Sequence, residues 1–427
     1  MTAVEREWIR RRRQAELDVR DGLSPVRSTE RSLYRPGELL LSLGAENQLA
    51  DVLRDRYAGR RYEWAGPDGW RNTVGMPVES GDLNARLETV DRVLWEVPPE
   101  TDLPVLVREL RALLPADDHT ARVDLNQVYF GEPLYQGGPG GEPYPIDPLD
   151  LAAVPAGITP DGVDLAVLDT GLPIDWMSLH PSLATWLTPD VNNRNLLVPP
   201  GAGAAGVLAT QAGHGLFISG LVRRVAPGLV VDPGLVLDPT GLGDDASIAA
   251  ELVETVAPVI CLSLGGYTED DNPPPGLSAA LAAKGPDVAV VAAAGNNDSS
   301  RPFWPAALKH VVAVAGYDST GGGQARTSFS NRGDWVDVCA PAVRLGSTYV
   351  RGTWAAHDGD REFDGWAGWS GTSFAAPLVA AEIARRLAAP GGPRTGRQAA
   401  LELLAELAPS PWPDLGLLYQ PPIDLTT

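Results

Sequence analysis

Ser370-Gly371-Thr372-Ser373-Phe374-Ala375-Ala376-Pro377 is the stretch that decides the fold. It leads into an apolar run, 378–384, which predicts a buried helix. Glycine, threonine and serine are typical of helix N-termini, and a proline near the first turn removes an amide that lacks an intrahelical partner. We therefore expect Ser373 at the start of a buried helix, beside backbone N–H groups that can stabilise an oxyanion. A helix-capping serine is the simpler alternative.

Composition limits the classes of function. The chain has 427 residues, 44% of them hydrophobic, which predicts two domains and a large core. Its net charge is −21 and its isoelectric point about 4.6, so a nucleic-acid-binding role is not expected.

The cysteines and the N-terminus bear on location and cofactors. Cys261 and Cys339 lie in apolar runs, which predicts two buried, reduced thiols; they lack metal-ligand spacing, and no cofactor is expected. The arginines at 10–13 are followed by polar residues rather than by the apolar segment of a signal peptide. No apolar stretch is long enough to predict a membrane helix. These features predict a cytoplasmic protein.

The first third of the chain predicts a small domain and a linker. Residues 1–33 are charged and predict a helix over about 4–20. Over 34–130 the patterns predict a ferredoxin-like β-α-β-β-α-β domain, with strands at 36–43, 60–64, 93–97 and 121–130 and helices at 46–57 and 103–114. Residues 131–160 are rich in glycine and proline, which indicates an extended linker.

Residues 161–427 predict a second domain of the α/β class. Apolar strands are expected at 163–169, 229–233, 258–264, 288–293 and 311–314, and helices at 213–222, 246–256 and 275–283. Continuous apolar strands that alternate with helices predict a doubly wound, mostly parallel sheet. Sites in such sheets gather at the carboxyl ends of the strands, where Asp169 and Asn296 are expected.

Three short motifs carry residues suited to acyl transfer. Asp169 ends the first predicted strand of the second domain, His214 stands between glycines at a helix start, and Ser373 opens the last predicted helix. A serine hydroxyl becomes a nucleophile when a neutral imidazole takes its proton and a buried carboxylate orients the imidazole. The amide of Asn296 can donate to the developing oxyanion. The strand end Ser263-Leu264-Gly265 is suited to pairing with an extended peptide.

Five ordered blocks together resemble the subtilisin-like serine protease family over about 162–384: Asp-Thr-Gly, Gly-His-Gly, Ser-Leu-Gly-Gly, Ala-Ala-Gly-Asn and Gly-Thr-Ser-Phe-Ala-Ala-Pro. The resemblance implies that Asp169 orients His214, that His214 is the general base and acid, that Ser373 is the nucleophile and that Asn296 lines the oxyanion hole. It implies one wall of the primary specificity pocket at Ser263, Leu264 and Gly265, a second wall at Ala293, Ala294 and Gly295, and a peptide-clamping edge that includes Gly241 and Gly243. The small domain resembles the family's propeptide, which would bring 126–136 near Ser373.

The chain also departs from the family pattern. The calcium-binding loop that often follows the histidine helix has no counterpart, so no metal is expected. The floor of the specificity pocket is not assigned, and Asp298 is either a bias toward basic substrates or a plain loop acid. The aromatic segment 349–369 could shape a substrate groove, dock the small domain or pack as a loop.

Three functions stay open at this point. The first is a serine endopeptidase with a regulatory or self-inhibiting N-terminal domain that acts on protein or peptide substrates. The second is a maturation protease dedicated to one partner or peptide precursor. The third is a protease-like binding or scaffold protein whose triad is present but occluded by residues 126–145. In any of the three, the N-terminal domain could bind a protein partner.

Overall fold

A mostly parallel sheet organises the larger domain of the computed structural model, which describes residues 26–63, 83–115, 121–131, 141–151, 154, 162–188, 208–356 and 359–427. Its main strands pair in the order β18-β15-β13-β12-β10-β7-β8, and every pair in this path is parallel. The short β14 pairs with β13 in the antiparallel sense. The strands are β7 (Leu165–Asp169), β8 (Val231–Leu235), β10 (Val259–Leu262), β12 (Ala289–Ala293), β13 (Val311–Asp318), β14 (Ala325–Arg326), β15 (Val338–Pro341) and β18 (Leu417–Leu418). The predicted α/β class with a doubly wound, mostly parallel sheet is confirmed.

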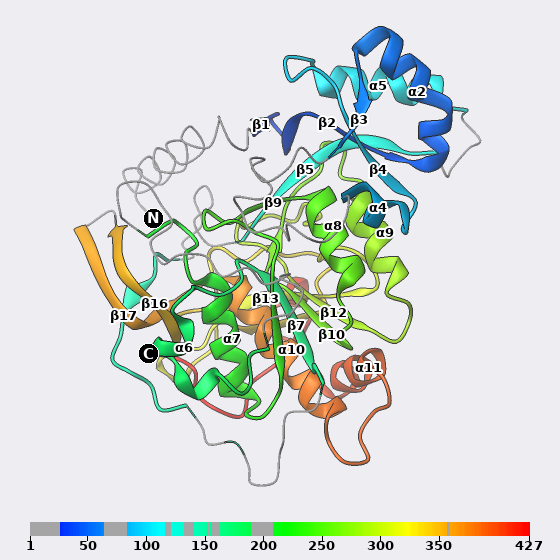
Figure 1. The fold of residues 1–427 in the computed structure, drawn as a ribbon. Coiled ribbons are helices and arrows are strands. Elements are labelled where there is room, and N and C mark those ends of the chain that lie inside the picture. Colours follow the sequence, from blue (N-terminus) through cyan, green and yellow to red (C-terminus); the bar gives the residue numbers. More distant parts are fainter. Residues whose placement is uncertain are drawn as a thin grey trace.

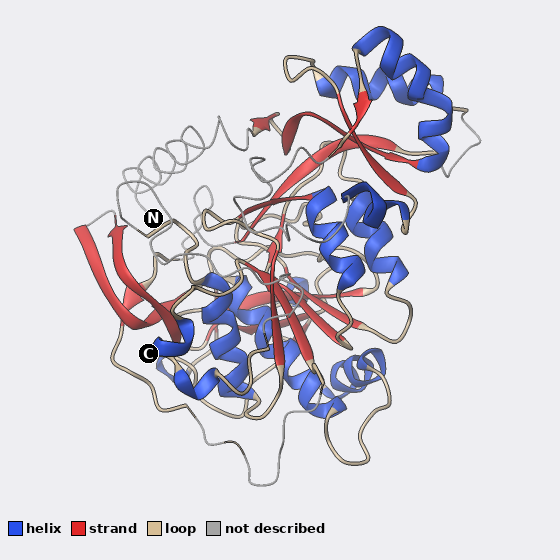
Figure 2. Cartoon of the chain, in the orientation of Figure 1, coloured by secondary structure: helices blue, strands red, loops and turns tan. Residues whose placement is uncertain are grey.

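Helices cover both faces of this sheet (Figure 2). Alternate residues of a strand point to opposite faces, and in β7 Val167 belongs to one core cluster while Leu168 belongs to another. The first cluster includes residues of α7 (His214–Val225), α10 (Thr372–Leu387) and α11 (Gly396–Glu406); the second includes residues of α8 (Asp245–Glu254) and α9 (Pro275–Ala283). The remaining helical segments of this domain are α6 (Trp176–Leu179), η1 (Pro181–Leu183), η3 (Thr320–Gly322) and η4 (Pro413–Leu415).

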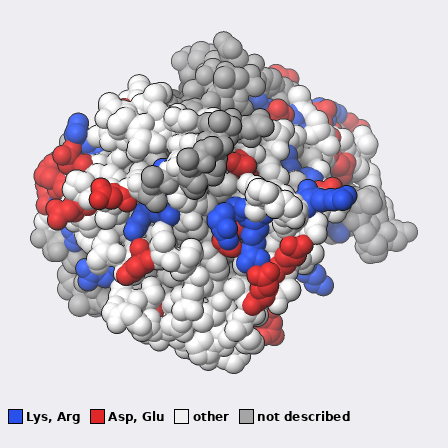
Figure 3. Space-filling model, turned by 90° about the horizontal axis from the view of Figure 1, so that it is seen from below, with Lys and Arg blue, Asp and Glu red and all other residues white. Residues whose placement is uncertain are grey.

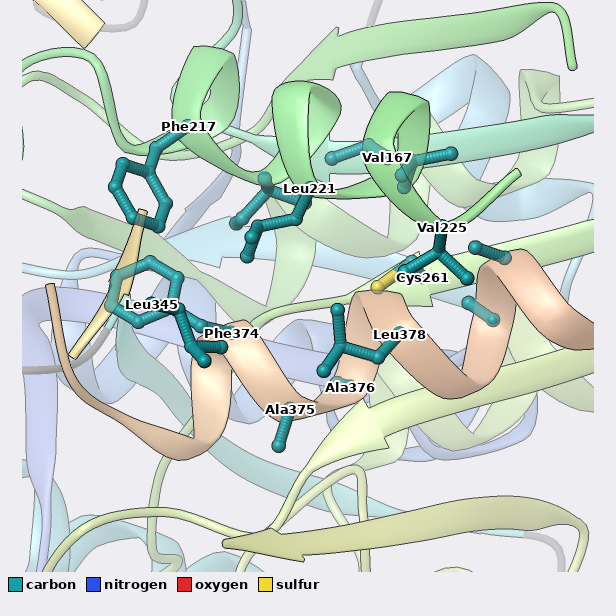
Figure 4. Packing of buried hydrophobic residues seen from close by; sticks show 14 of the residues in the cluster. Val167, Phe217, Leu221, Val225, Cys261, Leu345, Phe374, Ala375, Ala376 and Leu378 are labelled. Atoms are coloured by element: carbon teal, nitrogen blue, oxygen red, sulfur yellow. The ribbon is translucent and has the colours of Figure 1, made fainter. Parts of the chain in front are cut away.

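The two helices that begin at His214 and just before Ser373 pack against each other. Figure 4 shows Phe217 of α7 facing Phe374 of α10, and their ring centroids are 4.6 Å apart. Further along, Leu221 and Leu378 fill the space between the same helices and the sheet (Figure 4). This apolar contact fixes the start of one helix relative to the start of the other.

The N-terminal domain has a sheet and a core of its own. Its elements are β1 (Arg27–Ser28), β2 (Leu33–Ser42), α2 (Leu43–Tyr57), β3 (Arg60–Arg61), α4 (Leu83–Glu88), β4 (Arg92–Glu96), α5 (Leu103–Leu113) and β5 (Val123–Gly131). The strand order is β5-β2-β4-β3, all antiparallel, and β1 pairs with β2. Helices α2 and α5 cover one face of this sheet.

Helix α4 is an element that the sequence pattern did not predict. It has six residues, too few for a clear helical period, and its Leu83 and Leu87 are buried in the same cluster as residues of α8. A helix this short depends on tertiary packing for its stability. The predicted β-α-β-β-α-β order is therefore extended by one helix that packs against the larger domain.

Strand β5 joins the two domains. It leaves the small domain (Figure 1) and continues between β9 (Leu242–Asp244) and β11 (Leu264–Gly265), with antiparallel pairing to both. Tyr129 is opposite Gly243, and Gly131 is opposite Leu264. The N-terminal domain thus contributes the central strand of a sheet whose outer strands belong to the larger domain.

The aromatic segment 349–369 lies within a hairpin of β16 (Leu345–Ala356) and β17 (Gly359–Trp369). The hairpin lies at the opposite side of the molecule from the small domain (Figure 1). Part of the predicted linker forms β6 (Tyr144–Pro145), which pairs with β17. The predicted N-terminal helix, and the parts of the predicted linker at 132–140, 152–153 and 155–160, lie outside the described residues.

The described residues form neither a membrane-spanning helix nor a cluster of metal ligands. None of their helices combines the length and apolar character needed to cross a bilayer. Among the same residues, histidine, cysteine and carboxylate side chains do not gather in threes as a metal site would require. On the face drawn in Figure 3, acidic side chains gather at the left edge, whereas basic and acidic side chains are interspersed over the rest of the face.

Candidate active site

Asp169 and His214 form a buried pair at the carboxyl end of the sheet. Asp169 is the last residue of β7 and His214 the first of α7, and both side chains are fully buried. The Nδ1 atom of His214 donates to both carboxylate oxygens of Asp169, at 2.8 and 2.9 Å. Asp169 also accepts from the backbone N–H of Thr170 at 2.7 Å. With Nδ1 engaged in this way, the other ring nitrogen of His214 is the one left for proton transfer.

The residues next to this pair explain its position. The side-chain oxygen of Thr170 accepts from the backbone N–H of Gly215 at 2.9 Å, which ties the end of β7 to the first turn of α7. A Cβ atom at Gly215 would lie 2.6 Å from the carbonyl oxygen of Gly171, so only glycine permits this approach. Gly213 has φ of 75°, a left-handed conformation that favours glycine. Both glycines beside His214 are therefore required by local geometry.

Ser373 lies in the first turn of α10, as predicted. Its hydroxyl donates to the carbonyl of Ser263 at 3.2 Å. The Nε2 atom of His214 has no hydrogen-bond partner among the described residues. A rotation of the Ser373 hydroxyl away from Ser263 is therefore needed before it can donate to the imidazole.

Asn296 lies just after β12 and is tied to the same turn. Its Oδ1 atom accepts from the backbone N–H of Thr372 at 2.8 Å, and the hydroxyl oxygen of Thr372 accepts from the N–H of Gly295 at 3.0 Å. These two bonds fix the amide with its oxygen toward the helix start, so Nδ2 is the donor end of the side chain. Thr372 is a positioning residue that the sequence motif contained but did not reveal.

Two aromatic rings enclose His214. The ring centroid of Trp369 lies 5.5 Å from that of the imidazole, edge to face, and the centroid of Phe374 lies 5.2 Å away. Trp369 is the last residue of β17, so the hairpin packs on the histidine. The sequence marked this segment as aromatic, but nothing in it indicated the contact with His214.

Four of the predicted substrate-binding residues, Leu264, Gly265, Gly241 and Gly243, lie along the two edges that hold β5. On one edge, Leu264 and Gly265 form β11; on the other, the carbonyl of Gly241 accepts from Gly131 at 2.9 Å and Gly243 is opposite Tyr129. Ser263 precedes the first edge and contacts Ser373. The second predicted pocket wall, Ala293, Ala294 and Gly295, is buried at the end of β12.

Other titratable groups lie apart from this chemistry. The side chain of His180 is held by the carbonyl of Tyr349 at 3.0 Å, and burial lowers its pKa. Both cysteines are free and buried, as predicted, and burial raises the pKa of Cys261 to about 12. Asp298 forms an exposed ion pair with Arg332, which agrees with a loop acid.

Comparison with known proteins identifies the class. The subtilase family model matches residues 160–401. The chain is 33% identical over 260 residues to a thermophilic serine proteinase of Bacillus sp. (strain AK1), covering 57% of each chain. It is 32% identical to thermitase of Thermoactinomyces vulgaris, covering 57% of this chain and 81% of thermitase. The structure of fervidolysin from Fervidobacterium pennivorans, a keratinolytic enzyme related to subtilisin, has a similar fold (TM-score 0.54, 18% identity, 86% of this chain and 56% of fervidolysin).

The doubly wound, mostly parallel sheet and the match to the subtilase family agree on the class of protein, a hydrolase. The family match covers more than half of the chain. The chain belongs to the subtilase family of serine proteases.

Proposed function

We propose that this protein is a serine endopeptidase in which Asp169, His214 and Ser373 form the catalytic triad and the N-terminal domain blocks the cleft. The observation that carries the proposal is the buried His214–Asp169 pair, next to a cleft whose two edges hold a peptide strand. A bound substrate pairs with β9 and β11 in the same way as β5, because backbone hydrogen bonds along two edges recognise any extended peptide.

The reaction follows from the groups in the site. The Ser373 hydroxyl turns to His214, gives up its proton and attacks the substrate carbonyl, and His214 then gives the proton to the leaving amine. The N–H groups of Asn296 Nδ2 and of the Ser373 backbone donate to the oxyanion. Water then repeats the sequence on the acyl-enzyme. Asp169 holds the imidazole in orientation and stabilises its positive charge.

The N-terminal domain is proposed as the inhibitor because its docking is extensive and buried. Tyr129 of β5 is fully buried among residues of the larger domain, and Gly266 is so close that an added Cβ would lie 2.7 Å from the Tyr129 ring. The side-chain oxygen of Asn126, in β5, accepts from the backbone N–H of Ala246 in the first turn of α8 at 3.0 Å. Its side-chain nitrogen donates to the carboxylate of Asp244 at 3.1 Å. The likeness to fervidolysin covers more of this chain than the matched family segment does, which supports a related N-terminal domain.

A second candidate is the protease-like scaffold with a permanently occluded site. It is favoured by the complete burial of Asp169, His214 and Ser373, and by the end of the docked strand, where a Cβ atom at Gly131 would lie 3.6 Å from Cε1 of His214. Dedicated processing of one partner or peptide precursor remains a narrower form of the first proposal.

A fluorophosphonate probe, which reacts with activated serines, separates the two candidates. We expect slow labelling of the full-length protein, none of Ser373→Ala, and faster labelling of Tyr129→Ala, which removes the ring that anchors β5. Tyr57→Ala is the matched control and should label like the wild type, because Tyr57 ends α2 and its hydroxyl bonds Glu109 within the small domain. If the wild type and Tyr129→Ala both stay unlabelled while folded, the scaffold is correct.

A further inference from the structure

The side chain of Phe303 fills the space between the two predicted walls of the primary specificity pocket. Phe303 is fully buried. A Cβ atom added at Gly265 would overlap its ring, and one added at Gly295 would lie 3.0 Å from the ring atoms Cδ1 and Cε1. The same edge of the ring therefore touches both glycines, one from each wall.

The register of β5 shows which part of a substrate this space serves. A Cβ atom at Gly131 would lie 3.6 Å from Cε1 of His214, so the next residue of a bound peptide reaches the reacting serine. Side chains alternate along a strand, so that next residue points to the same face as Phe130. The ring of Phe130 lies edge-on to Phe303, with centroids 6.4 Å apart. Phe303 thus occupies the place of the side chain that precedes the scissile bond.

Neighbouring contacts hold Phe303 in this place. The N–H and carbonyl groups of its successor, Trp304, exchange hydrogen bonds of 2.9 Å with those of Gly266. The ring of Tyr267 packs edge-on to Phe303 at 5.2 Å. The Tyr267 hydroxyl donates to Asn297 at 3.3 Å and accepts from Asn331 at 3.2 Å, which joins the ends of the two walls. Displacing the ring would disturb all of these contacts.

We propose that Phe303 closes the primary specificity pocket and restricts this protease to substrates with glycine, alanine or serine before the scissile bond. The inference rests on the proposed function and names the substrate class of that site. A larger side chain meets the Phe303 ring, whereas a hydrogen, methyl or hydroxymethyl group needs no pocket. In close-packed surroundings even one added methylene group on the substrate side chain costs free energy of binding, because neighbouring side chains must move.

Fluorogenic peptides test the proposal. Each carries Tyr-Phe-Gly, the sequence at 129–131, followed by glycine, alanine, serine, leucine or phenylalanine before the scissile bond. The full-length Tyr129→Ala protein is used, because we expect loss of the Tyr129 ring to free its cleft. We expect kcat/KM for alanine to exceed that for phenylalanine at least 100-fold. Adding Phe303→Ala should raise kcat/KM for phenylalanine at least tenfold and leave that for alanine within threefold.

Two further variants keep the result interpretable. Phe303→Leu retains part of the volume and should give an intermediate preference, even where Phe303→Ala fails to fold. Phe363→Leu replaces a buried ring of the hairpin and should leave the ratio of the two rates unchanged.

The outcomes separate this inference from the proposed function. A protein that reacts with the fluorophosphonate but cuts after leucine or phenylalanine as fast as after alanine overturns the inference alone. Folded protein that neither reacts with the probe nor cuts any peptide overturns the proposed function and the inference with it.

Discussion

The hydroxyl of Ser263 donates to the backbone carbonyl of Ser373 at 2.7 Å, and the hydroxyl of Ser373 donates in return to the carbonyl of Ser263. The first bond replaces a missing helical one. Pro377 follows Ser373 by four positions and has no N–H, so α10 itself cannot provide the usual donor to that carbonyl. The sequence predicted Pro377 near the first turn of the helix, but it lies in the second turn. Because Pro377 has no N–H there, the carbonyl of Ser373 is left as an acceptor for the hydroxyl of Ser263.

We predict that Ser263→Ala destabilises the protein by about 1–2 kcal/mol, because a buried carbonyl loses its donor. The cost should shrink to below about 0.5 kcal/mol when Pro377→Ala is present, since the restored amide can bond the same carbonyl. Urea unfolding of the two single variants and the double variant measures this coupling. Equal costs of Ser263→Ala in both backgrounds would show that the hydroxyl does not substitute for the missing amide.

Replacing Asp169 should remove activity without removing the fold. Asp169→Asn keeps the shape of the side chain but no longer fixes the Nδ1–H form of His214. We expect the rate of fluorophosphonate labelling in the Tyr129→Ala background to fall by about 10⁴. Asp175→Asn is the control. Asp175 follows β7 in the chain and directly precedes α6, but it is Asp169 whose carboxylate bonds His214. Similar losses in both variants would contradict the role given to Asp169.

Some of this structure could be predicted because buried parallel strands are continuous apolar runs. The runs that became β7, β10, β12 and β13 were therefore recognisable, as was α5 with its one apolar face. The three proposed catalytic residues could be singled out because Asp169, His214 and Ser373 each stand beside glycine or threonine in a short motif.

The remainder depends on contacts between distant residues, which no local pattern records. Phe303 looks like any core phenylalanine until Gly265 and Gly295 are seen on its two sides. Trp369 is one of several tryptophans until the hairpin places it on His214. The register of β5 in the cleft likewise depends on a contact between distant residues, the hydrogen bond from the N–H of Gly131 to the carbonyl of Gly241.

The buried ion pair between Arg35 and Asp244 should matter for docking. Arg35 Nε lies 3.3 Å from Asp244 Oδ2, and both side chains are buried between the domains. Arg35→Met leaves a carboxylate buried without this partner, so we expect a loss of about 3–5 kcal/mol in unfolding free energy. Labelling of Ser373 should also become faster as β5 loosens.

Arg60→Met is the matched control. Arg60 pairs with Glu96 at 3.1 Å in the same domain, but it is 78% exposed. Exposed pairs contribute about 0–1 kcal/mol, so this variant should keep wild-type stability and labelling. Equal effects of both substitutions would refute a special role for the buried pair.

Asp245 gives the stability of the protein a defined dependence on pH. Its carboxylate accepts from the N–H groups of Gly276 and Leu277 at 2.8 and 2.7 Å, which ties α8 to the start of α9. Burial outweighs these bonds and raises its pKa from an ordinary 3.8 to about 7. The folded state therefore holds a proton that the unfolded state releases near pH 4. Its stabilising contribution is complete below pH 4 and is lost as pH rises toward 7.

We predict that Asp245→Asn removes this dependence. The variant should lose some stability at pH 5, where one of the two N–H groups lacks its acceptor, and less or none at pH 7.5, where the wild type carries a buried charge. Urea unfolding at both values gives the difference, with Asp51→Asn on the exposed face of α2 as the control. A gap between wild type and Asp245→Asn that stays constant from pH 5 to pH 7.5 would mean that Asp245 does not titrate in this range.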